Sequence, residues 1–346
     1  MPIKKVYLEM TNQCNLSCAM CYRHAWDYAT DAYDDQMVER IVEDLLTIDS
    51  LEEIVLGGIG EPTMHPRFLW VLERLSHLRI TLTSNAAYLS PALREGILEH
   101  VDRLVVSVDG NEDSYYDIRH VPLALVMETL QWFHEHKGKK KQVWPRLAIQ
   151  MVLSRKNEKD MIDVVDLAHR VGADKVIFSH LLPVSPGEQE DILYTLYQND
   201  GLKKRFAEVR GYALKKGMAT FLPDYRIKTE RHCRFLDEHT TMINARGEVV
   251  PCYRFSHDGK EIILGRAKQV HKMTWGNIME QRLQDIYDSP RYRAFRRTVQ
   301  NNQYPSCLDC DLQEGCDLVR TADVDCYGVA PSCADCLWSR NIVYCV

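Results

Sequence analysis

Three cysteines near the start of the chain have the type and spacing to hold a redox centre. Cys14, Cys18 and Cys21 follow the pattern C-x3-C-x2-C, directly after a short apolar segment. Three thiolates can hold a four-iron cluster and leave one iron open to bind and reduce a further molecule. The alternatives are a zinc site that borrows a fourth ligand from elsewhere in the chain, and thiols that only pack in the core.

The chain around these cysteines alternates between short β-rich runs and amphipathic helical windows. Strands are expected at residues 5–10, 53–56, 80–84, 103–108, 147–153 and 175–179. Helices are expected at residues 35–48, 67–77, 91–100, 123–136 and 159–171. Six strand–helix units in series predict an α/β fold with a parallel sheet and right-handed crossovers. In such folds the active site lies at the strand ends, where the three cysteines are expected.

A glycine-rich segment follows the second expected strand. It contains Gly57, Gly58 and Gly60, followed by Glu61 and a proline. Glycine lets the backbone approach a ligand closely, and exposed carbonyl groups at a strand end can accept hydrogen bonds from a ligand ammonium group. The alternative is a plain turn before a helix. The position of the glycine-rich segment in the second strand–helix unit, after the cysteine segment, favours a binding role.

Two further strand ends carry small polar side chains. Ser84 and Asn85 close the third expected strand, and Ser107 and Asp109 close the fourth. Their hydroxyl, amide and carboxylate groups suit a ribose or a ligand carboxylate. Arg119 and Gln150 are further candidates for a carboxylate and a ribose. The alternative is ordinary turn and capping chemistry, because Asp-Gly pairs and Asn are common in turns.

The composition limits the class of protein. The 346 residues suffice for one large domain and a smaller one. A net charge of −6 gives no basis for nucleic-acid binding, and no stretch approaches the roughly 20 uninterrupted apolar residues of a membrane span. Twelve cysteines without an export signal indicate metal or cluster ligation in a reducing cytoplasm rather than disulfides.

Nine of the twelve cysteines follow residue 230. They are Cys233, Cys252, Cys307, Cys310, Cys316, Cys326, Cys333, Cys336 and Cys345. The two C-x2-C pairs at 307–310 and 333–336 could form a four-thiolate zinc ribbon. That interpretation leaves Cys233, Cys252 and Cys316 unexplained.

The N-terminal motifs resemble those of radical S-adenosylmethionine (SAM) enzymes. The cysteine segment resembles the cluster loop of that family, with Met20 where most members have an aromatic residue. The glycine segment resembles the motif that binds the methionyl amine of SAM. The resemblance implies a partial (β/α)6 TIM-like barrel at residues 1–183 and linking helices at 184–230. It also implies a [4Fe–4S] cluster on Cys14, Cys18 and Cys21.

The late cysteines resemble the SPASM extension of the same family, expected at residues 231–346. The G-x4-C pattern ending at Cys252 implies a hairpin over 242–253, and the C-x2-C-x5-C pattern begins at Cys307. The next cysteine of the family would fall at Arg320, whereas this chain has Cys326. The resemblance implies two auxiliary four-thiolate clusters with one cysteine left over. One is assigned to Cys233, Cys252, Cys326 and either Cys333 or Cys336, and the other to Cys307, Cys310, Cys316 and another late cysteine.

The resemblance also implies a reaction. Such enzymes reductively cleave SAM to a 5′-deoxyadenosyl radical that abstracts a substrate hydrogen, and they need an external one-electron donor such as ferredoxin or flavodoxin. The motifs around 21–26, 57–66 and 333–345 resemble the branch associated with maturation of tungsten-dependent oxidoreductases. The alternatives are a SPASM enzyme that modifies a peptide or protein, and a non-enzymatic electron-transfer protein. The sequence identifies no catalytic acid or base.

Overall fold

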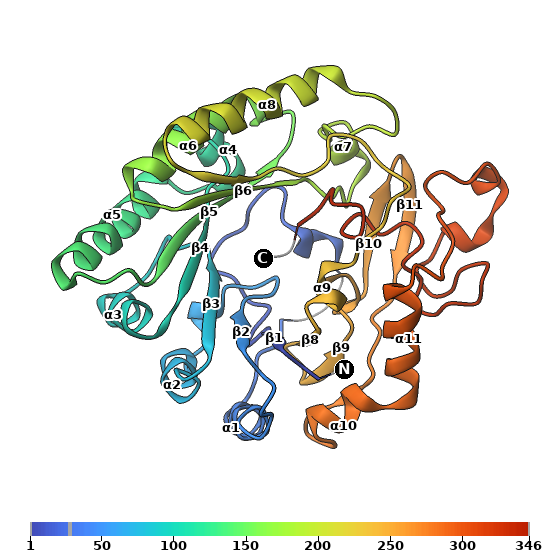
Figure 1. The fold of residues 1–346 in the computed structure, drawn as a ribbon, viewed down its shortest axis with the longest axis horizontal. Helices are drawn as coiled ribbons and strands as arrows, with labels where there is room; N and C mark the ends of the chain where they lie inside the picture. Colours follow the sequence, from blue (N-terminus) through green and yellow to red (C-terminus); the bar gives the residue numbers. More distant parts are fainter. Residues whose placement is uncertain (1, 27–29, 345–346) are drawn as a thin grey trace.

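The computed structural model describes residues 2–26 and 30–344. Within these residues, one curved sheet of ten strands has the order β12-β9-β8-β1-β2-β3-β4-β5-β6-β7. The strands from β8 through β1 to β7 are parallel to their neighbours, whereas β9 and β12 pair in antiparallel fashion. Helices lie along the convex side of the sheet, and the other side is open toward the C-terminal region (Figure 1).

The strands are short, and most are buried on both faces. Their bounds are β1 Lys5–Leu8, β2 Glu53–Leu56, β3 Arg79–Ser84, β4 Arg103–Ser107, β5 Arg146–Leu153, β6 Lys175–His180, β7 Ala219–Phe221, β8 Thr240–Ile243, β9 Glu248–Val250, β10 Gly259–Ile263, β11 Arg266–Val270 and β12 Gly276–Asn277. Strands β10 and β11 form a separate antiparallel pair.

The helices follow the strands in the pattern of a βα barrel. Their bounds are α1 Asp35–Leu45, α2 Phe68–Arg74, α3 Pro91–His100, α4 Glu112–Arg119, α5 Leu123–Lys140, α6 Met161–Arg170, α7 Pro186–Gln189, α8 Asp200–Lys215, α9 Arg234–Asp237, α10 Leu283–Asp288 and α11 Pro290–Gln300. Helix α1 illustrates why they form: the Asp34 side chain accepts a hydrogen bond from the Met37 N–H, and a stripe from Val38 to Leu45 is buried.

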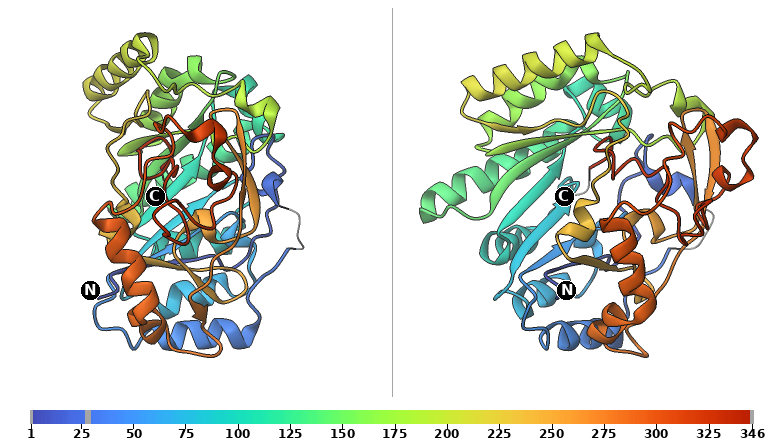
Figure 2. Two further views of the ribbon diagram at one scale, coloured as in Figure 1. Left: turned by 90° about the vertical axis from the view of Figure 1, so that its right-hand side faces the viewer. Right: turned by 45° about the vertical axis from the view of Figure 1, so that its right-hand side comes forward.

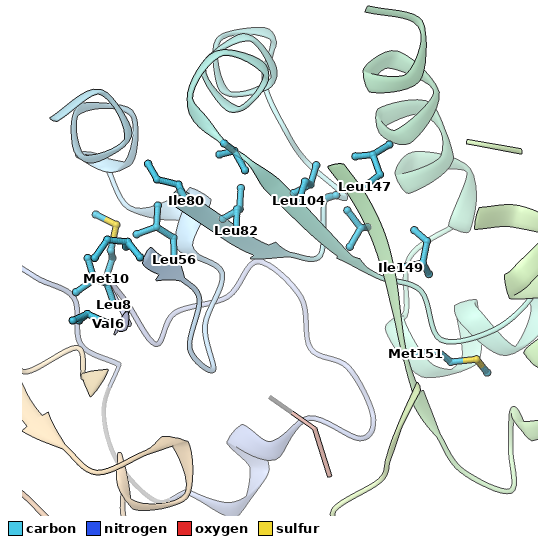
Figure 3. Packing of buried hydrophobic residues seen from close by; sticks show 14 of the residues in the cluster. Val6, Leu8, Met10, Leu56, Ile80, Leu82, Leu104, Leu147, Ile149 and Met151 are labelled. Atoms are coloured by element: carbon cyan, nitrogen blue, oxygen red, sulfur yellow. The ribbon is translucent and has the colours of Figure 1, made fainter. Parts of the chain in front are cut away.

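The two faces of the barrel strands have different roles. Residues on one face, such as Ile80, Leu104 and Leu147, pack against the surrounding helices (Figure 3). Successive side chains of a strand point to opposite faces. The other face therefore carries Thr83, Ser107 and Gln150, which line the mouth of the barrel. The apolar face fixes the strand register, and that register aims the polar residues inward.

The six expected strands are confirmed, with ends that shift by no more than two residues. The sequence did not predict α4 or β7. The barrel was expected to end at residue 183 and to be followed by linking helices, but β7 follows α8 and pairs parallel to β6. Helix α8 packs against α6, so the alternation continues after an irregular segment.

The expected hairpin at 242–253 is confirmed as β8 and β9, with Met242 paired to Val250 and a turn at Gly247. Strand β8 also pairs with β1 along its whole length. The hairpin therefore extends the barrel sheet. Beyond it, residues 301–344 run as largely irregular chain beside the β10–β11 pair and α11 (Figure 2).

A buried carboxylate ties β1 to this hairpin and to the glycine segment. Glu9 is fully buried, and its two oxygens accept hydrogen bonds from the Ile59 N–H at 3.1 Å and the Ala245 N–H at 3.1 Å. His257 Nε2 donates a third, at 2.6 Å. Because a buried carboxylate is stable only with several donors, these three contacts fix the relative positions of the three segments.

We expect Glu9→Ala to lower the free energy of unfolding by about 3 kcal/mol, because three buried donors would lose their acceptor. Chemical denaturation followed by circular dichroism measures the change. Glu52→Ala is the matched control, since Glu52 pairs with Lys4 on the surface and half of its side chain is exposed; it should change stability little. Equal stabilities for the two variants would contradict the role assigned to Glu9.

Candidate active site and cysteine groups

A cavity of about 320 Å³ opens at the carboxyl ends of the barrel strands. Its walls come from the cysteine segment after β1, the glycine segment after β2 and the ends of β3 to β6. Residues singled out from the sequence that line it are Cys14, Cys18, Cys21, Gly58, Gly60, Glu61, Ser84, Asn85, Ser107, Arg119 and Gln150. The fold thus gathers side chains from five strand ends at one site.

The three N-terminal thiols share this cavity with two nitrogen donors. Asn85 Nδ2 lies 3.8 Å from Cys14 Sγ, and Arg119 Nη1 lies 3.7 Å from Cys18 Sγ. Burial raises the pKa of Cys14 and of Cys18, so these thiols stay protonated unless a metal centre displaces the proton. N–H donors facing partly buried thiols suit anionic sulfur, so the residues fit an iron–sulfur cluster.

Backbone contacts hold the cysteine segment in place. The Ala19 N–H donates to Ile118 O at 2.8 Å, and Arg23 Nη2 donates to Leu16 O at 2.8 Å. Arg23 therefore shapes the loop. Met20 also lines the cavity and provides an apolar cover. It stands at the position where most members of the radical SAM family have an aromatic residue.

The glycine segment lies against two neighbouring segments without space for side chains. Gly58 has a φ of +117°, and an added Cβ would lie 2.6 Å from Glu9 Cγ. A Cβ at Gly60 would overlap the Thr11 carbonyl oxygen. Gly57 does not line the cavity, and its Cβ would lie 2.5 Å from Thr83 Oγ1. The glycines are thus required by close packing.

Glu61 braces this segment against the end of β3. Its carboxylate accepts hydrogen bonds from Ser84 Oγ at 2.9 Å, the Asn85 N–H at 2.8 Å and Thr63 Oγ1 at 2.7 Å. Burial raises its pKa, against the lowering effect of these bonds. Because its oxygens are occupied, Glu61 positions Ser84 and Asn85 at the cavity wall.

Asp109 has a comparable role at the end of β4. It is fully buried, and its Oδ2 lies 2.5 Å from Arg119 Nη2, while its Oδ1 accepts from the Val152 N–H at 2.7 Å. Burial lowers the pKa of Arg119, but the charges of Asp109 and Cys18 outweigh burial and the net pKa is raised. Asp109 thus acts through Arg119, the residue that faces the cavity.

A second, apolar cavity of about 40 Å³ is lined by four late cysteines, Cys233, Cys252, Cys333 and Cys336. Burial, with a smaller contribution from the neighbouring Cys336, raises the pKa of Cys252 to about 12. Burial also raises the pKa of Cys233 and of Cys333. Four buried thiols around one space suit a closed four-thiolate cluster. Among the described residues, no group of three or more His, Cys, Asp or Glu side chains is placed to bind a single metal ion.

This grouping differs from the allocation inferred from the sequence, which put Cys326 with Cys233 and Cys252. Cys326 is exposed, and neither it nor Cys307 or Cys310 lines the four-cysteine cavity. The pKa of Cys307 is raised to about 11, chiefly by burial, with Asp335, Cys326 and Cys310 raising it further toward that value. The pairs at 307–310 and 333–336 thus belong to different groups, which does not match a zinc ribbon built from both. Cys345 lies outside the described residues.

Two aromatic residues form the partition between the cavities. Tyr253 and Trp338 line both, and the Gly58 N–H donates to the Tyr253 hydroxyl at 3.1 Å. Val343 and Tyr344 complete the wall of the larger cavity, where the Tyr344 N–H donates to Ser179 Oγ at 3.0 Å. The sequence did not identify these residues, although Tyr253 directly follows Cys252.

The chain resembles known proteins in both halves. A family model described as the radical SAM superfamily matches residues 8–168, and one described as SPASM, an iron–sulfur cluster-binding domain, matches residues 233–311. A tungsten-containing aldehyde ferredoxin oxidoreductase cofactor-modifying protein of Pyrococcus furiosus is 35% identical over 350 residues, covering 99% of this chain and 97% of that protein. A PqqA peptide cyclase of Methylobacterium sp. is 23% identical over 332 residues, covering 88% and 78%.

Among solved structures, Streptococcus suis SuiB bound to S-adenosylmethionine has a TM-score of 0.65 at 19% identity. The match covers 91% of this chain and 72% of that one. At this identity the likeness shows the fold alone.

We expect Gly58→Ala to weaken SAM binding by tenfold or more, because the added Cβ would displace Glu9 and the left-handed backbone would be strained, at a cost of roughly 1–3 kcal/mol. Calorimetric titration with SAM and chemical denaturation measure the two effects. Gly211→Ala, in α8 with open space around it, is the control and should bind SAM normally. Normal SAM affinity in folded Gly58→Ala would make the glycine segment a structural turn only.

Iron content tests the grouping of the cysteines. If three clusters form, the reconstituted protein should hold about twelve irons per chain, and the Cys14→Ala/Cys18→Ala/Cys21→Ala variant about eight. Cys307→Ala/Cys326→Ala should lose one cluster and retain about eight irons, whereas Cys252→Ala/Cys326→Ala should lose two and retain about four. The reverse result for the two double variants would restore the allocation made from the sequence. About four irons and one zinc in the unmodified protein would mean that the late cysteines bind zinc and not two clusters.

Proposed function

The chain belongs to the radical SAM superfamily and carries its SPASM extension, and from this premise we propose that it matures a tungsten-containing aldehyde oxidoreductase by modifying the cofactor of that enzyme. One observation carries the proposal: 35% identity, over 99% of the chain, to a protein named for that role. A match over nearly the whole length includes the late cysteines and the cavity wall as well as the barrel.

The enzyme uses a [4Fe–4S] cluster and SAM, and the SPASM domain binds auxiliary clusters. We assign Cys14, Cys18 and Cys21 as ligands of the SAM-binding cluster, because their thiols share one cavity with the glycine segment. When bound, the cluster and SAM supply a reductive cleavage that yields a hydrogen-abstracting 5′-deoxyadenosyl radical. We assign one auxiliary cluster to Cys233, Cys252, Cys333 and Cys336, which line one cavity. We assign the other to Cys307, Cys310, Cys316 and Cys326, with Cys316 included because of its C-x2-C-x5-C spacing from Cys307 and Cys310.

The protein's own contribution is orientation and exclusion of water. Arg119, held by Asp109, offers a fixed positive charge in the cavity for a carboxylate such as that of SAM. Ser107 at the end of β4 and Gln150 within β5 offer hydrogen bonds to ribose hydroxyls. Trp338 and Tyr344 provide apolar wall that keeps solvent from the reacting atoms.

The partner proteins belong to the same proposal. We expect a protein substrate or its bound cofactor, and a one-electron donor of the ferredoxin or flavodoxin class, and we propose a reducing cytoplasm as their location because the sequence has twelve cysteines suited to cluster ligation. No helix in the described part of the chain is long and apolar enough to cross a membrane.

Peptide modification is the second candidate. It is favoured by the 23% identity to a protein named PqqA peptide cyclase, over 88% of this chain. In that case the substrate would be a side chain of a short precursor peptide. The cofactor and the aldehyde oxidation of a tungsten enzyme would then be unchanged by this protein.

The test uses a tungsten aldehyde oxidoreductase produced in cells that lack this protein. Incubation with the reconstituted enzyme, SAM and dithionite should release 5′-deoxyadenosine, change the mass of the extracted cofactor and increase aldehyde oxidation. The Cys14→Ala/Cys18→Ala/Cys21→Ala variant should give only background 5′-deoxyadenosine, because no open iron remains to bind SAM.

Two results would count against the proposal in different ways. Cleavage of SAM with an unchanged cofactor mass would exclude the tungsten substrate and favour peptide modification. Retained SAM cleavage in the triple variant would remove the assigned radical site itself and favour a role for the clusters in electron transfer alone.

A further inference from the structure

Four charged side chains form a buried network between the two groups of late cysteines. Arg254 pairs with Glu261 at 2.8 Å and with Asp335 at 2.9 Å, and Lys268 pairs with Asp335 at 2.5 Å. All four side chains are at most 2% exposed. Arg254 comes two residues after Cys252, and Asp335 lies between Cys333 and Cys336. Burying four charges is costly, so their position beside the thiols calls for a reason.

Arg254 is the member of the network that reaches the four-cysteine cavity. Its Nε and Nη2 donate to Glu261, and Nη2 also donates to Asp335. Its third nitrogen, Nη1, is buried and has no hydrogen-bond partner among the described residues. The side chain lines the cavity formed by Cys233, Cys252, Cys333 and Cys336. A buried guanidinium N–H without an acceptor is costly, because it loses its hydration without replacement. Arg23, Arg266, Arg296 and Arg340 also have such a nitrogen, but of these arginines only Arg254 lines the four-cysteine cavity.

The hydroxyls of the cavity lining bond elsewhere: the Tyr253 hydroxyl accepts from the Gly58 N–H, and the Ser339 hydroxyl donates to the Cys336 carbonyl. The permanently charged guanidinium lines the same small cavity as the Cys252 and Cys333 sulfurs. Arg254 therefore stands where it stabilises negative charge on these sulfurs. An iron–sulfur cluster with four thiolate ligands is anionic, and its sulfurs accept hydrogen bonds from N–H groups.

We propose that Arg254 donates an Nη1–H hydrogen bond to a sulfur of the cluster held by Cys233, Cys252, Cys333 and Cys336, and so raises the reduction potential of that cluster. The proposal rests on the assignment of these four cysteines as cluster ligands. One-electron reduction adds one negative charge to the cluster and takes one electron from an external reductant such as dithionite. A fixed donor on a permanently charged group stabilises the reduced form more than the oxidised form.

Glu261 and Asp335 hold the donor in position. Together with Lys268 they balance the charge of the network, two positive groups against two negative ones. Glu261 also accepts a hydrogen bond from the Tyr22 hydroxyl at 3.0 Å, and Tyr22 directly follows Cys21. Arg254 is thereby fixed relative to the N-terminal cysteine segment as well as to the late cysteines.

The test is a redox titration with dithionite, followed by electron paramagnetic resonance. The Cys14→Ala/Cys18→Ala/Cys21→Ala background leaves only the late clusters to titrate. In this background, Arg254→Met/Glu261→Gln removes one positive and one negative charge, so the net charge of the network stays the same. We expect the reduction potential of one of the two auxiliary clusters to fall by at least about 59 mV. For a one-electron couple this is about a tenfold change in the equilibrium constant for reduction. The other signal should stay unchanged and serves as an internal reference.

Arg296→Met is the matched control. Arg296 is an equally buried arginine that donates to Tyr287 O at 2.6 Å and lies over the Tyr287 ring. Its Nε also has no hydrogen-bond partner among the described residues, but its side chain does not line the four-cysteine cavity. This variant should leave both auxiliary potentials unchanged. Two unshifted signals in Arg254→Met/Glu261→Gln with full iron content would overturn the proposal, and so would an equal shift in Arg296→Met.

A measurement on the unmodified residues covers the case in which the variant does not bind its cluster. Protein labelled with ¹⁵N-arginine and reduced by dithionite should show, by pulsed electron paramagnetic resonance, a nitrogen coupling to one auxiliary cluster. Absence of that coupling would overturn the proposal. Fewer than about eight irons in the background variant would instead overturn the ligand assignment on which the proposal rests.

Discussion

The Glu9 carboxylate is the constraint on which the arrangement of the site depends. It lies at the end of β1, between the glycine segment and the turn of the β8–β9 hairpin, and it accepts hydrogen bonds from both and from His257. Since a carboxylate without solvent must be satisfied by fixed donors, these segments cannot move independently. The register of β8 against β1 then brings Tyr253 to the mouth of the barrel and Cys252 to the second cavity behind it.

This arrangement places the radical site and the four-cysteine cavity on two sides of one thin wall. Tyr253 and Trp338 line both cavities, and Tyr253 contacts the glycine segment directly.

The two sites also share an electrostatic design. At the radical site, the buried Asp109 holds Arg119, whose Nη1 lies 3.7 Å from Cys18 Sγ. At the four-cysteine cavity, Glu261 and Asp335 hold Arg254. In both places a carboxylate orients a guanidinium toward sulfur, so positive charge is available where anionic sulfur is expected while the net charge of the surroundings stays low.

The sequence by itself determined the local features, because each depends on neighbours in the chain. The spacing of Cys14, Cys18 and Cys21, the glycines after the second strand and the six strands all follow from patterns a few residues long. The tertiary structure alone decided which late cysteines meet, that Asp109 and Glu61 brace other residues, and that Glu9 and Arg254 contact distant segments. These outcomes depend on how strands far apart in the chain pack together, and the number of residues between two cysteines does not fix the distance between them once the chain has folded.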